Sequence, residues 1–411
     1  MEIICAEEHC TGCAACMNAC PKDAISMQPR GAFQHIYPTI NPEVCIDCGL
    51  CAKICPVNTP ISLTTPLRAF AAISRDDNDL MSSSSGGAAS VMSAYILKQG
   101  GVVYGCVQKN YRDIAHRRID SAADAAKLKG SKYVQSNINL VYREVKADLR
   151  MGTPVLFTGT PCQIAGLRAY LRKDYDNLYL VDLVCHGVPS QYLLWENVES
   201  MLGQKSLRNL PYVDFRKKNE PLDRMFGIFL RNTPKMSKKK QLFLYNDYIT
   251  AFMTGLTYRP NCYACAYAQP NRGSDITISD FWGIGHTSVP TDKGISLLLQ
   301  NTEKGGTLIA NCLPAFHWEE RSVEEAIQGN GQLIQPTTKP ENRDTFELDY
   351  ASFGTKAYRK HLREYRFRWR LEHNLLTPQH YLYIALNKLK STAKKIPGAR
   401  ILYQYLKSKI K

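Results

Sequence analysis

One cysteine pattern occurs twice near the start of this chain and constrains its fold more than any other feature. Each copy is C-x2-C-x2-C-x3-C followed by proline, and together they comprise Cys10, Cys13, Cys16, Cys20, Cys45, Cys48, Cys51 and Cys55. This spacing ligates 4Fe–4S clusters, and the fourth cysteine of each run binds the neighbouring cluster. The pattern therefore predicts one cluster on Cys10, Cys13, Cys16 and Cys55, and a second on Cys45, Cys48, Cys51 and Cys20.

Disulfide bonds and zinc sites are the alternatives for these eight cysteines. Disulfide bonds belong to oxidising compartments, and we expect a cytoplasmic protein because no secretory signal precedes Cys10. Zinc sites usually combine two C-x2-C pairs rather than a run of three cysteines that ends in C-P. Iron–sulfur ligation is the prediction that fits both the spacing and the expected compartment.

Composition and charge further restrict the class of protein to which this chain can belong. The 411 residues are 44% hydrophobic and 22% charged, which is typical of a soluble globular protein. No apolar run approaches the roughly 18 residues that span a bilayer. The net charge is +15, and the 15 lysines and arginines from Lys356 onward, opposed by Glu364 and Glu372, supply most of it. The body is therefore close to neutral, which argues against specific binding of nucleic acid.

The basic segment at the C-terminal end reads as a helical tail over residues 336–411. Arginines alternate with aromatic residues around Phe367 and Trp369, and further lysines follow among apolar residues. A basic amphipathic helix can lie on the inner face of a membrane or bind an acidic partner. A solvated helical face is the simpler alternative.

Between these segments, short apolar runs alternate with helical stretches. After a linker around Pro60–Pro66, we expect strands at 68–74, 102–107, 154–158, 178–184 and 275–279. We expect helices at 86–99, 122–128, 140–150 and 162–171. This alternation favours an α/β core with parallel strands. The predicted domains are an α+β ferredoxin-like domain at 1–60, an α/β domain at 67–335 and the tail at 336–411.

A second set of cysteines lies outside the two runs. Cys162 and Cys185 each follow a predicted strand, and Cys262 and Cys265 form a C-x2-C pair. The carboxyl ends of parallel strands are where open α/β folds bind ligands. Four such thiolates predict a third metal site, for which a 4Fe–4S cluster and zinc are the alternatives. A reactive thiol at Cys162 is a further alternative, since a helix start lowers a thiol pKa. Cys5, Cys106 and Cys312 read as small buried residues.

The sequence around these cysteines resembles the coenzyme F420 hydrogenase/dehydrogenase beta-subunit family, with a fused two-cluster ferredoxin domain. The resemblance covers Cys10 to about Gly283 and rests on the segments GTPCQ (159–163), CHGVPS (185–190), RPNCYAC (259–265), DITISDFWG (275–283), Ser82–Gly87 and KGSKYVQS (129–136). It implies an iron–sulfur flavoprotein with two 4Fe–4S clusters, a third on the second cysteine set, and FAD in the α/β domain.

Two segments are the candidates for FAD binding. Small residues before a helix let backbone N–H groups approach a phosphate, and these are Ser83, Ser84, Ser85, Gly86 and Gly87. The second segment is Lys129, Gly130, Ser131, Lys132 and Tyr133, whose lysines can neutralise phosphate and whose ring can pack on a flavin. Helix capping and a solvated turn are the ordinary alternatives.

His186 and Asp280 are the candidate catalytic residues. His186 adjoins Cys185 and is the best candidate to move a proton near a flavin, although a lone histidine is more often structural. Asp280 follows a predicted strand and can line the same cavity, as can Trp282.

The expected function is an oxidoreductase that passes electrons between 4Fe–4S clusters and FAD. A soluble ferredoxin or a redox partner subunit would exchange single electrons, and a small-molecule or lipid-linked organic substrate would exchange two. Bacterial relatives occur among genes for surface polysaccharides, which makes that pathway one expectation. The alternatives are an electron-transfer subunit without its own substrate site, and a zinc-stabilised scaffold tethered to a membrane by the tail.

Overall fold

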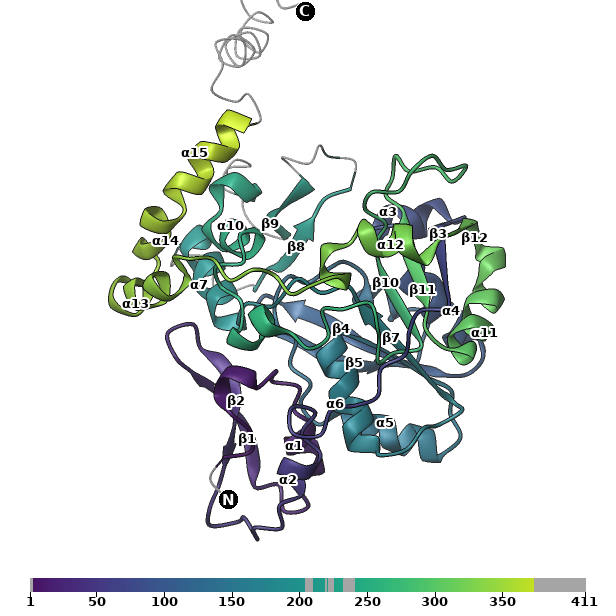
Figure 1. Cartoon of the computed structure of the whole chain (residues 1–411), viewed down its shortest axis with the longest axis horizontal. Helices are drawn as coiled ribbons and strands as arrows, with labels where there is room; N and C mark the ends of the chain where they lie inside the picture. The colour runs from purple at the N-terminus through teal and green to yellow at the C-terminus, as the bar shows by residue number, and fades with distance from the viewer. Residues whose placement is uncertain (1–2, 204–209, 219, 221–224, 232–240, 373–411) are drawn as a thin grey trace, which may run out of the picture. The chain divides into compact units, whose positions relative to one another are not determined.

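The computed structural model describes residues 3–203, 210–218, 220, 225–231 and 241–372 (Figure 1). The chain divides into two compact units, Met1–Thr355 and Lys356–Lys411. The described part of the second unit consists of helices α14 (Lys356–His361) and α15 (Arg363–Glu372), so this part of the predicted tail is helical. The remaining basic residues of the tail, from Lys388 onward, lie outside the described residues.

The cysteine-rich segment folds into a small α+β arrangement, as the sequence predicts. Strands β1 (Ile25–Arg30) and β2 (His35–Ile40) pair antiparallel, and helices α1 (Ala15–Ala19) and α2 (Leu50–Lys53) carry cysteines of the two runs. Gly12 adopts a φ of +68° between two cysteines, in the left-handed region that glycine accepts without strain. A Cβ there would lie 2.6 Å from Nε2 of Gln135, so the loop is also packed tightly.

The larger part of the first unit is built on an eight-stranded mixed sheet (Figure 1). Its strands, in spatial order, are β12 (Phe316–Arg321), β3 (Arg68–Ser74), β11 (Ser296–Gln300), β10 (Ile276–Asp280), β7 (Leu178–Leu183), β6 (Val155–Gly159), β4 (Val102–Asn110) and β5 (Asp113–Ile119). The neighbours β4, β6, β7 and β10 are parallel, as predicted. The prediction of a parallel core missed β5, β11 and β12, each of which pairs antiparallel with its neighbours.

Helices cover both faces of this sheet. The described helices of the first unit that follow β3 are α3 (Asp77–Ser82), α4 (Ala88–Lys98), α5 (Val141–Arg150), α6 (Pro161–Leu171), α7 (Gln191–Leu202), α10 (Asp247–Met253), α11 (Glu303–Cys312), α12 (Val323–Gln328) and α13 (Arg343–Phe353). The helix predicted at 122–128 is shorter and of the 3-10 type, η2 (Ala125–Leu128). Strands β8 (Tyr212–Arg216) and β9 (Phe226–Arg231) form a separate hairpin.

The buried core explains how the cysteine-rich domain is held against the sheet. One apolar cluster joins α5 and α6 to alternate residues of β4, β6 and β7, and it includes Ala14, Ala15 and Ile54 of the cysteine-rich domain. A second cluster joins α4 and α11 to the opposite face of the sheet. The cysteine-rich domain therefore shares its core with α5 and α6.

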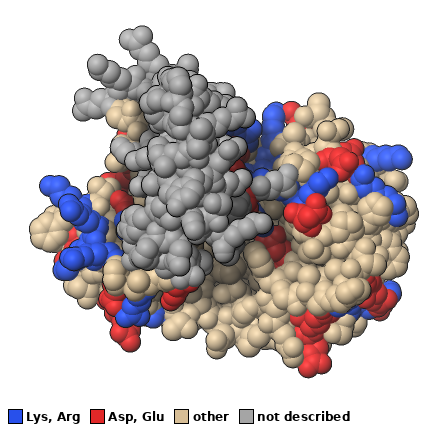
Figure 2. All heavy atoms as spheres, turned by 90° about the horizontal axis from the view of Figure 1, so that it is seen from above, with Lys and Arg blue, Asp and Glu red and all other residues tan. Residues whose placement is uncertain are grey.

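Two surface properties bear on the function. Acidic and basic side chains are interspersed over the face seen in Figure 2, in keeping with a body close to neutral. Among the residues described above, no helix combines the length and apolar character needed to cross a bilayer.

Candidate functional site

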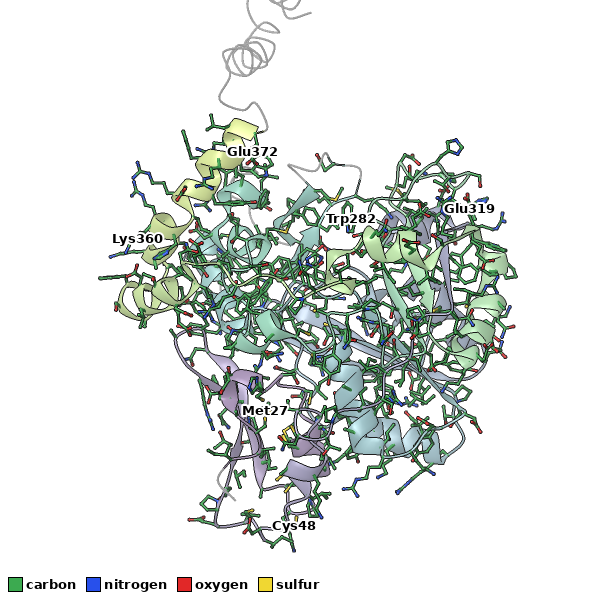
Figure 3. All side chains as sticks on the ribbon, viewed as in Figure 1. Met27, Cys48, Trp282, Glu319, Lys360 and Glu372 are labelled. Atoms are coloured by element: carbon green, nitrogen blue, oxygen red, sulfur yellow. The ribbon has the colours of Figure 1, made fainter. Side chains whose placement is uncertain are left out.

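The eight cysteines of the two runs separate into two groups in space. One small cavity is lined by Cys10, Cys13, Cys16, Cys55 and the additional Cys5. A second small cavity is lined by Cys20, Cys45, Cys48 and Cys51. The fourth cysteine of each run thus lies with the first three of the other run, which is the crossed arrangement that the spacing predicts. In Figure 3, Cys48 lies at the outer end of the domain, where its side chain is exposed.

Cys5 lies beside Cys10, Cys13, Cys16 and Cys55, although it is not part of the repeated cysteine pattern. We call Cys10, Cys13, Cys16 and Cys55 the inner group, and Cys20, Cys45, Cys48 and Cys51 the outer group. The thiol of Cys5 hydrogen-bonds with Cys10 and Cys55 of the inner group. This hydrogen bond, ahead of the positive charge of Arg259, lowers the pKa of Cys10 although burial opposes it. Cys5 therefore lies beside the inner group rather than in a separate part of the core.

The second set of cysteines gathers at the carboxyl ends of β6 and β7. Cys162 lies in the first turn of α6, directly after β6, and Cys185 follows β7. Cys262 and Cys265 lie at the short 3-10 helix η5 (Pro260–Ala264). Burial raises the pKa of both Cys185 and Cys262 to about 12. Such thiols hold their protons until a bound metal displaces them.

Helix α6 lies between the second cysteine set and the inner group. A Cβ on Gly166 would lie 3.0 Å from Sγ of Cys13, so the backbone of α6 touches an inner cysteine directly. Cys162 precedes Gly166 by four residues, which is about 6 Å along a helix. The hydroxyl of Tyr142 on α5 donates to the carbonyl of Gln163 at 2.8 Å and fixes this turn. The two cysteine sets are therefore close neighbours across one turn of helix.

A buried guanidinium between these sets provides a test of whether an iron–sulfur cluster fits. The side chain of Arg259 is fully buried, and within the part of the chain that the structure describes its Nη2 atom has no hydrogen-bond partner. Its Nε donates to the carbonyl of Cys10, and its carbonyl accepts from N–H of Cys262. An uncompensated buried cation costs several kcal/mol. Since four thiolates give a 4Fe–4S cluster a net negative charge, the residues fit such a group.

Zinc and a 4Fe–4S cluster are the two alternatives for the metal at the second cysteine set. Across the described ranges, no three histidine, cysteine or carboxylate side chains lie close enough together to hold a single metal ion. A zinc ion needs four ligands, with thiolates at about 2.3 Å. Metal analysis of the purified chain distinguishes zinc from iron at these cysteines.

A cavity opens beside the second cysteine set, at the carboxyl edge of the sheet. Its volume is about 350 Å³, within the range of roughly 300–1,000 Å³ that is typical of cofactor sites. The predicted site residues in its walls are Ser83, Ser84, Ser85, Gly87, Lys129, Gly130, Ser131, Lys132, Tyr133, Cys162, Cys185, His186 and Asp280. Gly86 lies behind the wall, where a Cβ would come within 2.2 Å of the carbonyl of Ala72. The structure thus brings both predicted FAD segments to one cavity.

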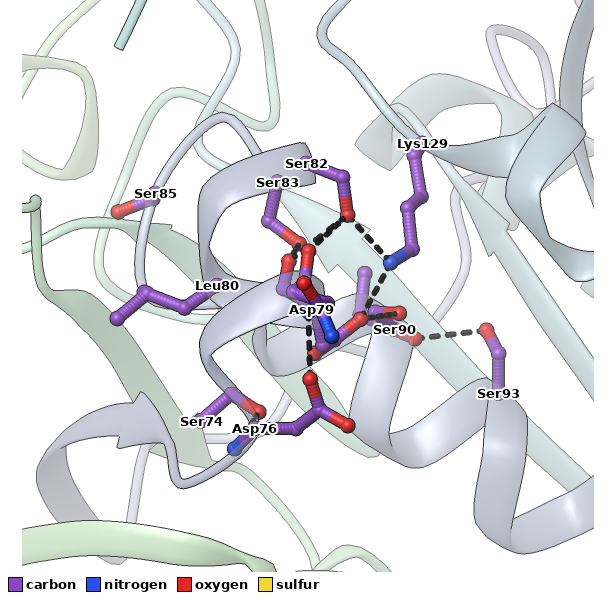
Figure 4. Close-up of polar contacts among 12 residues, drawn as sticks. Ser74, Asp76, Asp79, Leu80, Ser82, Ser83, Ser85, Ser90, Ser93 and Lys129 are labelled. Atoms are coloured by element: carbon purple, nitrogen blue, oxygen red, sulfur yellow. Dashed lines mark hydrogen bonds and ion pairs between the residues drawn. The ribbon is translucent and has the colours of Figure 1, made fainter. Parts of the chain in front are cut away.

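Residues Ser83–Gly87, which we call the serine segment, are held by a polar network around Asp79 (Figure 4). Oδ1 of Asp79 accepts from Ser90 and pairs with the ammonium of Lys129, each at 2.5 Å. Lys129 also donates to the hydroxyl of Ser82 at 2.7 Å, and Ser83 donates to the carbonyl of Asp79. Much of the Lys129 charge is therefore balanced by a carboxylate that the sequence analysis did not single out.

Asp280 and Lys132, two other ionisable groups in the cavity wall, also have partners in the protein. Asp280 forms an ion pair of 2.6 Å with Arg216, which is largely buried. The amine of Lys132 donates to the carbonyls of Leu128 and Lys129, and burial lowers its pKa. His186 is exposed in the cavity, and the packing around its ring lowers its pKa against the opposing pull of Asp280. Arg216 comes from the β8–β9 hairpin, for which the sequence analysis made no site prediction.

His116 is a second histidine in the cavity wall, and the sequence analysis did not predict it. Its Nε2 donates to the carbonyl of Thr158 at 2.9 Å, and its Nδ1 accepts from the hydroxyl of Ser136 at 2.8 Å. Burial lowers its pKa to about 4, so the ring is neutral at pH 7. No sequence motif marks His116, which reaches the cavity because β5 pairs antiparallel with β4.

Tyr133 is packed in a group of aromatic rings. Its ring stacks on Phe252 with centroids 4.8 Å apart, and it meets Phe215 edge-on at 5.8 Å. Its hydroxyl remains in the cavity wall near Arg216. One ring face is therefore engaged by protein, and this limits the surface that Tyr133 can offer to a ligand.

Two family models match this chain. Residues 152–326 match the C terminus of the coenzyme F420 hydrogenase/dehydrogenase beta subunit, and residues 9–59 match a 4Fe–4S dicluster domain. The first match contains the second cysteine set, His186 and Asp280, and the second contains all eight cysteines of the two runs.

Two curated relatives match short stretches of this chain, and a chain of one solved structure is similar to more of it. A polyferredoxin-like protein of Methanocaldococcus jannaschii is 37% identical over 68 residues, which are 15% of this chain and 40% of that protein. A ferredoxin of Alicyclobacillus acidocaldarius is 42% identical over 45 residues, covering 11% of this chain and 50% of its own length. A chain of the F420-reducing [NiFe] hydrogenase complex from Methanosarcina barkeri is 18% identical with a TM-score of 0.41, covering 74% of this chain and 93% of that one.

Proposed function

Because this chain belongs through residues 152–326 to the coenzyme F420 hydrogenase/dehydrogenase beta-subunit family and carries a 4Fe–4S dicluster domain, we propose that it is an iron–sulfur flavoprotein oxidoreductase. It exchanges single electrons with a carrier protein or partner subunit, and two electrons with an organic substrate. When bound, 4Fe–4S clusters supply one-electron exchange, and FAD supplies the conversion to two-electron chemistry.

The observation that carries this proposal is the order of the cysteine sets. An outer group with the exposed Cys48 is followed by an inner group, and Gly166 then brings α6 and the second set against Cys13. The second set in turn contributes Cys162 and Cys185 to the wall of the cavity that also contains both predicted FAD segments. Such an order suits a protein that moves charge from its surface to a binding site.

The cavity supports the flavin part of the proposal. Its serine segment leads into α4, a helix of 11 residues whose first turn is approached without bulky side chains. Helix N-termini favour anionic phosphates. Since Lys129 is paired with Asp79, the backbone N–H groups and Lys132 would hold the pyrophosphate, and the apolar side of the cavity would exclude water from the ring system.

His186 and the Arg216–Asp280 pair are the groups that would act on an organic substrate. A neutral imidazole exposed in the cavity can accept or return a proton, whereas an ion-paired carboxylate orients a substrate through its remaining oxygen lone pairs. We assign His186 the proton and Asp280 the orientation of the substrate. Replacement of His186 by glutamine should lower turnover about 100-fold or more while leaving flavin content unchanged.

The test is an anaerobic analysis of iron, sulfide, zinc and flavin in the purified chain, alongside a Cys162→Ser variant. We expect about twelve irons per chain, at four for each of three clusters, one flavin and no zinc. The variant should lose about four irons and keep the flavin. About eight irons with zinc and no flavin would reject the proposal. Flavin binding without turnover of any small molecule by the isolated chain would favour an electron-transfer subunit.

A further inference from the structure

A second cavity lies apart from the first, beside the outer cysteine group. It has a volume of about 380 Å³ and includes Cys20, Pro21 and Leu50 of the cysteine-rich domain in its walls. The facing wall comes from α5 and α6, which lie beside α1 and α2 in Figure 1. The cavity thus marks where the outer cysteine group approaches the surface on the side of these two helices.

Positive charge gathers on and beside that wall, where Arg143, Lys146 and Arg172 line the cavity. One face of α5 presents three cations at helical spacing, and the end of α6 adds two more, so that the set is Arg143, Lys146, Arg150, Arg172 and Lys173. We call this set the basic face. Burial, followed by the charges of Arg150, Arg172 and Lys173, lowers the pKa of Lys146. The cations are therefore close enough to repel one another.

Among the residues that the structure describes, Arg143 is the one member of the basic face that has an ion-pair partner. Arg143 pairs with Asp23 at 2.6 Å and donates to the carbonyl of Cys20 at 3.0 Å, which ties the basic face to an outer cysteine. For the other four, no ion pair is formed with any described residue. Lys146 instead lies over the ring of Tyr170, and Lys173 over that of Tyr175.

The fold alone does not account for this arrangement. Cations near the last turn of a helix interact favourably with its dipole, which explains Arg150 and Arg172. Lys146 is one turn earlier, and a like-charged pair such as Lys146 and Arg150 at i, i+4 destabilises a helix. An acidic partner would turn this repulsion into attraction.

We propose that the basic face is the docking surface for an acidic one-electron carrier protein of the ferredoxin type. The inference rests on the proposed function and extends it by naming the place and charge of the partner. On docking, the carrier loses one electron, the group held by the outer cysteines gains it, and no bond forms or breaks. Complementary charge raises the association rate and makes it sensitive to salt.

The test measures binding and electron transfer with the anaerobically purified chain and a reduced, acidic 2[4Fe–4S] ferredoxin. A charge-reversal variant, Lys146→Glu with Arg172→Glu, is compared with a matched control, Lys109→Glu with Lys127→Glu. The two control lysines are exposed and lie outside the cavity wall. We expect the variant to weaken ferredoxin binding at least tenfold at low salt and to remove most of its salt dependence, and the control to match the unmodified chain.

A second electron donor distinguishes failure of the docking surface from failure of the proposed function. Photoreduced 5-deazariboflavin is uncharged, so it should reduce the unmodified chain and the charge-reversal variant at equal rates. Equal binding of ferredoxin by variant and unmodified chain, or binding that ignores salt, overturns the docking surface alone. Binding of anionic vesicles that the variant loses, with ferredoxin binding unchanged, overturns it in favour of a membrane. If neither donor reduces the unmodified chain, the proposed function falls and the docking surface with it.

Discussion

The Nε atom of Arg259 donates a hydrogen bond to the carbonyl oxygen of Cys10 at 2.7 Å. The two residues are 249 positions apart in the chain, and each adjoins a different cysteine set. The backbone of Arg259 is also held by two hydrogen bonds. Its N–H donates to the carbonyl of Val188, and its carbonyl accepts from the N–H of Cys262. One residue thus joins the loop of the inner group to two loops of the second set.

The charge of Arg259 should set the reduction potentials of the neighbouring clusters. Arg259→Gln removes a buried positive charge that favours an added electron, so the potentials should become more negative by about 60 mV, a tenfold change for one electron. Arg259→Lys keeps the charge and should shift them less. A redox titration followed by electron paramagnetic resonance measures the change. Arg30→Gln, at an exposed ion pair of the same domain, is the control. Unchanged potentials in Arg259→Gln would contradict this role.

Contact between Gly166 and Cys13 predicts a sensitive position in α6. Alanine in a helix is normally more stable than glycine by about 1 kcal/mol. At Gly166 the added Cβ would lie 2.9 Å from both Cβ of Cys13 and the hydroxyl of Tyr142. Overpacking of this kind typically costs about 1–3 kcal/mol. We therefore expect Gly166→Ala to lower the unfolding midpoint and reduce the iron content. In Gly331→Ala nothing lies within 4 Å of the new Cβ, and both quantities should be unchanged.

The buried ion pair between Asp182 and Arg272 should be essential for stability. The two side chains are 0% and 1% exposed and lie 2.8 Å apart. Arg272 also donates to the carbonyls of Tyr267 and Leu183, so it links the end of β7 to the loop after Cys265. Asp182→Asn leaves a buried charge uncompensated and should cost about 3–5 kcal/mol in denaturant unfolding.

An exposed pair provides the comparison for Asp182. Glu320 and Arg68 are joined by two hydrogen bonds at the surface, and both side chains are about half exposed. Glu320→Gln should cost only about 0–1 kcal/mol, because solvent already screens this pair. Equal losses in the two variants would show that burial does not govern these ion pairs.

Lys218 should make ligand binding at the serine segment depend on pH. Its amine donates to the carbonyls of Leu80 and Ser85, and burial, followed by repulsion from Arg216, lowers its pKa to about 8. The other charged groups that face it are Asp79, Asp280 and Lys293. The ammonium is charged below pH 8, and its attraction for a pyrophosphate is lost as the pH rises through that value.

The measurement is the affinity for FAD or ADP on either side of pH 8. Affinity should fall as the pH rises in the unmodified chain, whereas Lys218→Met should bind more weakly at low pH and show little further change. Lys293→Met, which removes a more exposed lysine paired with Asp77, should retain the pH dependence. An unmodified chain whose affinity does not change across pH 8 would contradict the assignment.

Local sequence was sufficient where a residue's environment is set by its near neighbours. The strand predicted at 68–74 matches β3, and the helix predicted at 162–171 begins one residue earlier in α6. The crossed grouping of the eight cysteines also followed from spacing, because a short loop limits which sulfurs can meet. By contrast, β11 is a short buried run that periodicity cannot separate from a helix segment.

Long-range pairing explains the site residues that were missed. Asp79 and Lys129 are 50 residues apart, and Arg216 and Asp280 are 64 apart, so no local pattern joins either pair. His116 and β12 were missed for the same reason, since each depends on an antiparallel neighbour brought in by the fold. Arg259 did carry a signal: an arginine three residues before a predicted ligand cysteine is a candidate for its counter-charge.

The exposure of Cys48 has a consequence for survival in air. Thiolate ligands at a surface meet dissolved oxidants first, whereas Cys13 and Cys16 are buried behind them. Under the proposed function, the three metal groups work in sequence, so damage at the tip disconnects the interior while leaving it chemically intact. A sample briefly exposed to oxygen should keep most of its iron and flavin and yet stop accepting electrons from its protein donor.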